Sequence, residues 1–325
     1  MPKGKILVVG GAGYIGSQCA KELKKDGFEP VVLDNLSSGH ERNVRWGRFL
    51  NGDIGDAVFL EKIFSEERFD GVMHFAAHAL VGESVENPGK YYQNNVAATL
   101  TLLQAMARHD VKRFIFSSTC ATYGEPAETP MSETHPQNPI NPYGRSKLMV
   151  ESMLKDFDAA HGLRYAALRY FNAAGADPDG ETGEEHDPET HIIPLAIAAA
   201  LGKRESVSVF GSDYDTPDGT CVRDYIHTVD LCSAHILALK RLQEGGESSV
   251  YNLGNGEGYS VLQVIEAVKK VSGRTFKIDV KGRRLGDPAR LIGSSEKIKA
   301  ALGWSPKYPD LEDIVRTAYA WHASR

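Results

Sequence analysis

The feature that most constrains the fold is a glycine-rich segment between a short apolar run and a helical pattern. The run Lys5–Val9 is rich in β-branched residues, which is typical of a strand buried on both faces. Apolar residues recur at helical spacing over Tyr14–Lys25, and Gly10, Gly13 and Gly16 lie at the junction. Without a Cβ the chain can turn sharply there and approach a pyrophosphate at the amino end of the helix. A dinucleotide site or a tight turn without a ligand both fit this motif alone.

Strand and helix patterns alternate through the first half of the chain. Further strands are expected at residues 30–33, 49–54, 71–77, 113–118 and 165–171, and long helices at residues 88–108 and 143–161. Strands separated by helices of this length form right-handed crossovers and a parallel sheet. The sequence therefore predicts an α/β fold with a doubly wound parallel sheet, of the Rossmann type.

The second half has a different character. Gly, Pro and Asp crowd residues 176–188, which predicts a loop and a domain boundary. Helical segments at residues 192–201, 230–243 and 262–271 follow, separated by short strands and turns. We expect residues 1–170 to form a dinucleotide-binding domain and residues 171–325 to form mainly a smaller, mixed α/β substrate domain. Some later segments are allowed to return to the first lobe.

Composition excludes several classes of protein. The net charge is −6 and there is no basic run, so we expect no nucleic-acid partner. The longest nearly apolar stretch, residues 192–201, contains Pro194 and is far shorter than the ~20 residues that span a bilayer. The first five residues lead straight into a strand and do not resemble a signal peptide. We expect no membrane association and a cytoplasmic location.

The sequence indicates no metal site. The four cysteines show no Cys-x-x-Cys spacing, so neither a zinc site nor a disulfide framework is expected. His74 and His78 lie four apart, but His74 belongs to a predicted strand, where that spacing does not converge. His186 and His191 flank an acidic loop, but their spacing is too loose to indicate a site.

Two aspartates end predicted strands at one edge of the sheet. Asp34 follows Gly16 by 18 residues, close to the ~20 expected for the carboxylate that holds the ribose hydroxyls of a dinucleotide. Its charge would repel a 2′-phosphate, and no Arg follows it closely, which favours NAD over NADP. An ordinary turn aspartate is the alternative. Asp53 either accepts a bond from the adenine amino group or caps the next helix.

Tyr143 and Lys147 lie four residues apart, on one face of a predicted helix. An adjacent ammonium and a cationic nicotinamide would favour the phenolate, which can take a proton from an alcohol while hydride leaves its carbon. Such a pair occurs about once by chance in a chain with this many Tyr and Lys. The position of the pair favours a catalytic role over a chance occurrence, because the pair follows the fifth strand, whose end carries the hydroxyl of Thr119. Strand ends of this kind border the cofactor crevice.

Several motifs together resemble the extended short-chain dehydrogenase/reductase family, and within it the UDP-glucose 4-epimerases. The motifs are Gly10–Gly16, Asp34-Asn35, residues 74–77, 81–84 and 91–96, Tyr143-x-x-x-Lys147, and residues 169–172, 219–227, 251–254 and 283–289. The match runs from the first strand to the last helix. The resemblance implies bound NAD, a UDP-sugar substrate, and a homodimer built on the helices at residues 88–108 and 143–161. Those helices could equally use their apolar faces against the sheet.

The resemblance also implies a reaction. Tyr143 would remove the proton of the sugar 4-hydroxyl, NAD⁺ would take hydride from C4, and the 4-keto sugar would rotate and accept the hydride on its other face. Lys147 would hold the nicotinamide ribose and lower the pKa of Tyr143. Thr119 stands where most of the family has Ser.

The family's binding residues carry over position by position. Those implied for NAD are Gly10, Gly13, Tyr14, Ile15, Gly16, Asp34, Asn35, Asp53, Ile54, Phe75, Ala76, Ala77, Asn94, Ser117, Tyr143, Lys147 and Tyr170. Those implied for the UDP-sugar are Thr119, Tyr143, Asn172, His191, Phe210, Arg223, Tyr225, Arg283, Asp287 and Leu291. Arginine suits a diphosphate, although ion pairing is the alternative for Arg223 and Arg283. Phe210 either stacks near the uracil or belongs to a core.

Departures from the family pattern bear on substrate choice. Ala79 lies where some members have a Lys near the pyrophosphate, and His191 where an Asn often touches the substrate. Leu291 lies where some members have a bulky Tyr, which suggests that N-acetylated sugars also fit. UDP-xylose or UDP-arabinose is a further possible substrate, and a non-catalytic, NAD-sensing protein is the alternative from another class.

Related sugar-nucleotide dehydratases and decarboxylases carry an acidic residue after the strand-five hydroxyl. Here Cys120 and Ala121 occupy those positions, so a dehydratase would lack its proton donor.

Overall fold

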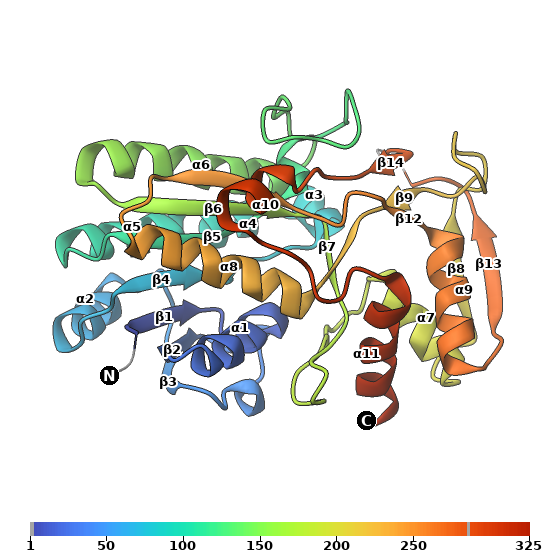
Figure 1. The fold of residues 1–325 in the computed structure, drawn as a ribbon, viewed down its shortest axis with the longest axis horizontal. Helices are drawn as coiled ribbons and strands as arrows, with labels where there is room; N and C mark the ends of the chain where they lie inside the picture. Colours follow the sequence, from blue (N-terminus) through green and yellow to red (C-terminus); the bar gives the residue numbers. More distant parts are fainter. Residues whose placement is uncertain (1–2, 285–286) are drawn as a thin grey trace.

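The computed structural model describes residues 3–284 and 287–325 and is built around a seven-stranded sheet (Figure 1). All its strands run parallel, in the order β11-β6-β5-β4-β1-β2-β3. The strands are β1 (Lys5–Val9), β2 (Glu29–Asp34), β3 (Arg48–Asn51), β4 (Gly71–His74), β5 (Arg113–Thr119), β6 (Arg164–Tyr170) and β11 (Ser249–Leu253). The predicted parallel sheet is confirmed, but β3 and β4 end about three residues earlier than expected. The chain leaves the sheet there to form the loops that face the site.

Helices cover both faces of this sheet. On one face α2 (Ala57–Glu66), α5 (Ala98–Arg108) and α6 (Pro142–His161) contribute to one apolar core. On the other face α1 (Tyr14–Lys25), α8 (Thr228–Gln243) and α10 (Glu296–Leu302) contribute to a second. Strand residues alternate between these two cores, since Leu7 and Val9 point to the first while Ile6 and Val8 point to the second. The doubly wound arrangement is therefore confirmed.

The long helix expected at residues 88–108 is not regular. It consists of α4 (Pro88–Tyr91), wider π-helical turns over Tyr92–Ala97, and α5, and it follows the short α3 (Val81–Glu86). Within the π-helical turns Asn95 is buried and bonds the backbone N–H and carbonyl of His78 and the hydroxyl of Ser146. Such turns often mark functional sites, and here they carry Asn94 to a cavity wall.

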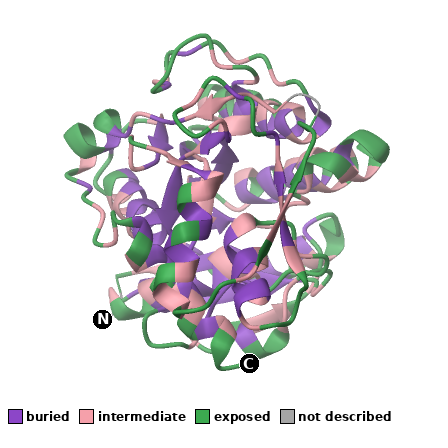
Figure 2. Cartoon of the chain, turned by 90° about the vertical axis from the view of Figure 1, so that its right-hand side faces the viewer, coloured by how far each residue is buried: buried purple, intermediate pink, exposed green. Residues whose placement is uncertain are grey.

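A smaller, mixed α/β lobe lies at the right of Figure 1. Its strands pair as β7 (Asn172–Ala174) with β10 (Tyr225–His227), β8 (Ser206–Phe210) with β13 (Lys277–Lys281), and β9 (Val222–Arg223) with both β12 (Tyr259–Ser260) and β14 (Arg290–Leu291). Helices α7 (Ile192–Ala200), α9 (Val261–Ser272) and α11 (Leu311–Ala323) surround a third apolar core. Figure 2 shows buried residues gathered inside and exposed residues on the outer helix faces.

Three segments after residue 170 return to the large sheet: β11 joins it, and α8 and α10 pack on one of its faces. Strand β11 pairs with β6 along its whole length, and α8 packs on the second core. The loop at residues 175–191 reaches back to α1, where the ammonium of Lys21 contacts Asp177 at 2.5 Å and Asp179 at 2.8 Å. The division of roles between residues 1–170 and 171–325 stays a prediction.

None of the helices in the described part of the chain combines the length and the apolar character needed to cross a membrane.

Candidate functional site

The turn between β1 and α1 requires glycine at two positions for internal reasons. Gly10 has a φ of 77°, and a Cβ there would lie 2.5 Å from the Ala76 amide nitrogen. A Cβ on Gly16 would overlap the Gly10 carbonyl oxygen. Gly13 differs, because its nearest neighbour would be 3.4 Å away and it caps α1 without a side chain. The amino end of α1 is therefore open to a ligand, and its free N–H groups suit a pyrophosphate.

Asp34 ends β2 beside this turn. Its carboxylate accepts hydrogen bonds from the backbone N–H of Ala12 (2.9 Å) and of Leu36 (2.8 Å), which fix its orientation. Each oxygen keeps a lone pair, so the carboxylate can still accept bonds from ribose hydroxyls. The side chain lines a recess together with Asn35, Asp53, Ile54, Phe75, Ala76, Ala77 and Asn94.

Asp53 does not cap the next helix. Its oxygens accept bonds from the Asn35 side-chain amide and the Gly55 N–H, both at 2.7 Å. Asp56 is the cap of α2, because its carboxylate accepts from the first two free N–H groups of that helix. Of the two interpretations of Asp53, helix capping is wrong, and the contact with adenine stays a prediction.

Tyr143 and Lys147 occupy the first turns of α6. The helix begins after Asn141, whose side chain accepts from the Gly144 N–H at 2.8 Å, and Pro142 is its first residue. The side chain of Lys147 is only 2% exposed. Its ammonium donates to the Ser117 carbonyl oxygen at 2.8 Å and lies 4.8 Å from the centre of the Phe116 ring. The end of β5 thus fixes the lysine.

The pKa of Tyr143 moves opposite to the direction expected from an adjacent ammonium. Burial raises it to about 12, against the lowering effect of a hydrogen bond with Thr119. Burial also lowers the pKa of Lys147 to about 7, opposed by the charge of Glu151. The nitrogen of Lys147 faces the Ser117 carbonyl, and Lys147 is not among the groups that shift the pKa of Tyr143. A lowering of that pKa by Lys147 stays a prediction. A further positive charge beside the phenol would be needed to favour the phenolate.

A buried network supports the end of β5 and the middle of α6. Glu151 accepts from the Ser118 hydroxyl at 2.6 Å and from two nitrogens of Arg169, at 2.9 and 2.5 Å. Both charged side chains are almost fully buried. Ser117, next along β5, hydrogen-bonds the hydroxyl of Tyr170. These contacts hold β5, β6 and α6 in one register around Lys147.

A cavity of about 440 Å³ joins the glycine turn to the smaller lobe. Every residue predicted to bind NAD lines this cavity or the adjoining recess at Asp34. The predicted substrate residues that line it are Thr119, Tyr143, Asn172, His191, Asp287 and Leu291. Ala79, Cys120 and Ala121 also face it.

Four predicted substrate residues are not among the described residues of the cavity wall. Tyr225 lies in strand β10 and its side chain packs in the third core, which explains why it is not part of the cavity wall. Of the other three, Arg223 contacts a residue of the wall, whereas Arg283 and Phe210 contact residues outside it. Arg223 pairs with Asp287 at 2.6 Å, Arg283 pairs with Asp213 at 2.7 Å, and the Phe210 ring lies under Arg284 at 3.9 Å. The motif at residues 283–289 is only partly visible, since residues 285 and 286 lie outside the described part.

Sequence reasoning missed several residues of the wall. Glu184 and His186 enter it from the loop at residues 175–191, and Phe171 from the segment after β6. The spacing of the two histidines and the nearby acids was the available signal for the loop. No periodic pattern marks a loop, so its path could be learned only from the structure.

Comparison with known proteins follows the geometry. A model of the NAD dependent epimerase/dehydratase family matches residues 6–254. The chain belongs to this family. The UDP-glucose 4-epimerase of Halalkalibacterium halodurans is 53% identical over 317 residues, which cover 98% of this chain and 95% of that protein.

Solved structures agree. The UDP-glucose 4-epimerase from Brucella ovis in complex with NAD is 51% identical, with a TM-score of 0.95 and coverage of 98% of each chain. The UDP-Glc/GlcNAc 4-epimerase from Campylobacter jejuni is 47% identical, with a TM-score of 0.87 and coverage of 99% of each chain. The resemblance inferred from the motifs is confirmed.

Proposed function

We propose that this protein is an NAD-dependent UDP-glucose 4-epimerase, which interconverts UDP-glucose and UDP-galactose by inverting C4 of the sugar. The observation that carries the proposal is one continuous cavity, which runs from an open glycine turn to Tyr143, Lys147 and Thr119. The match to proteins of this name over nearly the whole chain supports the same activity.

The turn and the recess fit NAD by their own chemistry. The pyrophosphate would lie at the amino end of α1, where Gly13 presents no side chain. Asp34, oriented by two backbone N–H groups, would accept from the adenosine ribose and disfavour a 2′-phosphate. Bound NAD would supply the reversible hydride transfer at C4 of the sugar.

Tyr143 is the proposed acid–base group. Tyr143 and Thr119 both line the cavity, so their hydroxyls would be able to contact the sugar 4-hydroxyl. Because burial raises the pKa of Tyr143 to about 12, proton removal needs a positive charge nearby. The nicotinium ring and a protonated Lys147 are the two available sources, and the proton returns when the 4-keto group is reduced.

The diphosphate would meet residues of the smaller lobe. Arg223 is 2.6 Å from Asp287, which itself lines the cavity. Phosphate can replace this carboxylate as the partner of the guanidinium, because both accept its forked donors. Asn172, whose side chain donates to the Asp224 carbonyl, is placed beside the same wall.

The test compares the wild type with Tyr143→Phe and with the matched control Tyr319→Phe, whose ring lies in the third core. Conversion of UDP-galactose to UDP-glucose is followed by chromatography without added cofactor. We expect Tyr143→Phe to lower kcat by about 10²- to 10⁴-fold, as for loss of a general acid–base group, with unchanged NAD content. Turnover equal to the control would refute the proposed role.

A second substrate class is favoured by one residue of the wall. Leu291 lines the cavity, and its side chain is smaller than a tyrosine. A UDP-Glc/GlcNAc 4-epimerase is among the similar structures. We therefore propose that UDP-N-acetylglucosamine is also epimerised, and absence of turnover with this sugar would rule it out.

We also propose a homodimer, formed through α6 and, in place of the expected helix at residues 88–108, through α3, because α5 contributes its apolar face to the first core. Helices α3 and α6 contact each other, and Val81, Val85 and Met149 on them are 46%, 63% and 45% exposed. Light scattering of the wild type and of Val85→Asp tests this, since a monomeric wild type would exclude it. We propose a cytoplasmic location as well. All four cysteines belong to the described part of the chain and are free thiols, which supports this location.

A further inference from the structure

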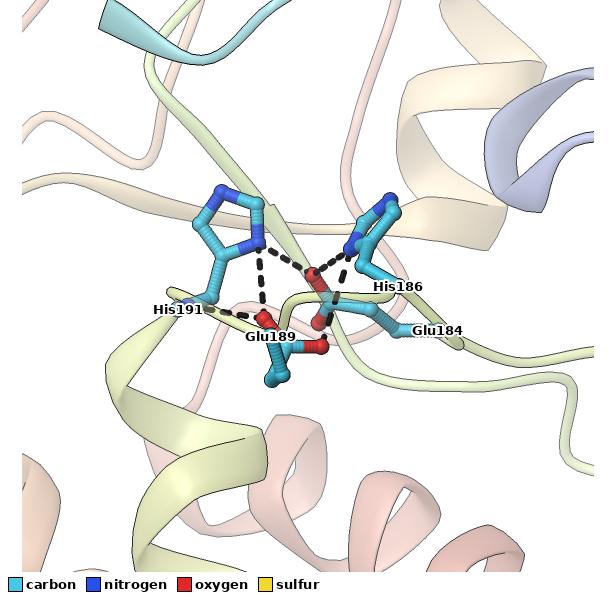
Figure 3. Close-up of side chains that lie close together, drawn as sticks. All are labelled: Glu184, His186, Glu189 and His191. Carbon is cyan, nitrogen blue, oxygen red and sulfur yellow. Dashed lines mark hydrogen bonds and ion pairs between the residues drawn. The ribbon is translucent and has the colours of Figure 1, made fainter. Parts of the chain in front are cut away.

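Four side chains converge where the loop at residues 175–191 meets α7 (Figure 3). They are Glu184, His186, Glu189 and His191, and we call them the Glu184 cluster. Glu184 is almost fully buried, whereas the two histidines are partly exposed. Glu184, His186 and His191 also line the cavity. The cluster therefore has a buried base and an open side.

The histidines present the same nitrogen to the carboxylates. Nδ1 of His186 lies 3.3 Å from Glu184 and 3.6 Å from Glu189. Nδ1 of His191 lies 2.5 Å from Glu184 and 3.5 Å from Glu189. Figure 3 shows both Nδ1 atoms turned toward the carboxylate oxygens and both Nε2 atoms turned away. One potential ligand atom from each residue thus faces a common centre, and all four lie within 4.8 Å of one another.

These separations match a tetrahedral metal site. Zinc binds imidazole nitrogen and carboxylate oxygen at about 2.0–2.2 Å, so neighbouring ligand atoms in a tetrahedron are about 3.4 Å apart. Three of the four nitrogen–oxygen separations lie between 3.3 and 3.6 Å. Two adjustments would complete the tetrahedron. His191 and Glu184 would move apart by about 1 Å, and the Glu189 carboxylate would rotate, because its Oε2 faces His186 and its Oε1 faces His191. Small rotations of partly exposed imidazoles can supply the first adjustment.

The charges also favour a divalent cation. Within residues 3–284 and 287–325, the two carboxylates have no ion-pair partner except these imidazoles. A buried carboxylate requires a compensating charge. One divalent ion with two neutral histidines balances both carboxylates. By contrast, the nearby acidic group Asp177, Asp179 and Glu181 already surrounds the ammonium of Lys21 at 2.5–2.8 Å.

We propose that the Glu184 cluster binds one divalent transition-metal ion, with zinc as the preferred metal. Two imidazoles and two carboxylates in tetrahedral positions are a donor set that suits zinc. The ion would link the loop to His191, the residue immediately before α7. The ring of Tyr14 lies beside the cluster, edge-on to the His186 ring, with 6.3 Å between the ring centres. The effect of the ion is to fix this wall of the cavity.

The competing interpretation is a metal-free pair of charged hydrogen bonds. The two carboxylates raise the pKa of His186 to about 9 and of His191 to about 10, so protons also satisfy the cluster. Zinc would have to displace them. Measuring the metal content distinguishes the two interpretations, because only the proposed metal site requires one ion per chain.

The experiment uses the full chain with its nucleotide, treated with a chelator and then dialysed against limiting Zn²⁺. Bound zinc is measured by mass spectrometry and affinity by calorimetry. We expect one Zn²⁺ per chain, a higher Tm with zinc, and a Co²⁺ derivative with the intense visible absorption of tetrahedral coordination. His186→Gln and His191→Gln should each weaken binding by at least about 10-fold, while His161→Gln, on the exposed end of α6, should not.

Three results would overturn the proposal. Less than half an equivalent of zinc in the wild type would favour the metal-free ion pairs. Equal zinc in the wild type and in His186→Gln/His191→Gln would place the ion elsewhere, on the nucleotide or another surface. Asp179→Asn, which alters the Lys21 group, should retain zinc, and loss there alone would also contradict the assignment. Circular dichroism of each variant confirms folding, and none of these results depends on turnover.

Discussion

Lys147 is a buried cation with little compensation, so we predict that Lys147→Met stabilises the fold. Its ammonium has one hydrogen bond, to the Ser117 carbonyl, and the face of the Phe116 ring. Burial lowers its pKa from 10.5 to about 7. Methionine has a similar length and adapts to irregular surroundings. The substitution removes the charge and leaves the volume nearly filled.

The size of the effect follows from linkage. Each pH unit of difference between the folded and unfolded pKa is worth about 1.4 kcal/mol, so keeping Lys147 charged in the fold costs about 5 kcal/mol as an upper figure. Losing the hydrogen bond and the ring contact costs about 1 to 3 kcal/mol. We therefore expect Lys147→Met to be about 2 to 4 kcal/mol more stable than the wild type at pH 6.

The stability difference between the wild type and Lys147→Met should change with pH in a defined direction. Between the folded pKa of about 7 and the unfolded value of 10.5, the unfolded wild type binds the extra proton. Its stability should therefore rise with pH relative to Lys147→Met, by about 1.2 kcal/mol per pH unit between pH 7 and 9. The advantage of the variant shrinks accordingly and is lost between about pH 8 and pH 10, depending on how much the lost contacts cost.

Urea unfolding of both proteins from pH 6 to 9 measures this difference. Bound nucleotide is quantified in each preparation, because a ligand of the native state alone adds to the unfolding free energy. Lys147→Met should also lose epimerase activity. Parallel stability curves over this pH range would refute the argument, since they would show that Lys147 does not titrate there.

Three further predictions concern the turn, the network and the ribose site. Gly16→Ala should lower nucleotide content and Tm, because its Cβ overlaps backbone, whereas Gly82→Ala in α3, with open space around it, should leave both unchanged; equal Tm values would contradict this. Arg169→Met should cost about 3 to 5 kcal/mol in urea unfolding by leaving Glu151 unpaired, and the double variant with Glu151→Met should recover most of it; no recovery would argue against the ion pair as the cause. Asp34→Ser should weaken NAD binding by about 10- to 100-fold in calorimetry. It should also reduce the ratio of the NADP dissociation constant to the NAD dissociation constant, and an unchanged ratio would show that Asp34 does not determine the choice between the two nucleotides.

The parts of the molecule that depend on neighbouring residues were predictable. The strand, glycine turn and first helix follow from local spacing, and so does the placement of Tyr143 and Lys147 on one helix face. The family resemblance then assigned NAD residues that all reach the cavity or its recess. Local pattern and family motif agree there because one backbone turn sets both.

Features that depend on distant pairing were not predictable. Arg223 and Asp287 are 64 residues apart in the chain, so their ion pair is not encoded by any spacing. Tyr225 lies in a strand, and its burial depends on a core to which the helices α7, α9 and α11 contribute. The pKa of Tyr143 was expected to fall and instead rises, because burial raises it by more than the hydrogen bond with Thr119 lowers it.

The position of β11 ties the two halves of the chain into one folding unit. This strand, at residues 249–253, forms an outer edge of the large sheet, and β6 would be left with an open ladder in its absence. A fragment truncated at residue 170 would also lack α8 and expose the apolar surface that it covers. Unpaired edges and bare apolar faces invite self-association. Residues 1–170 therefore do not form an independent folding unit, and chimaeras with related members of the family should exchange them together with residues 228–253.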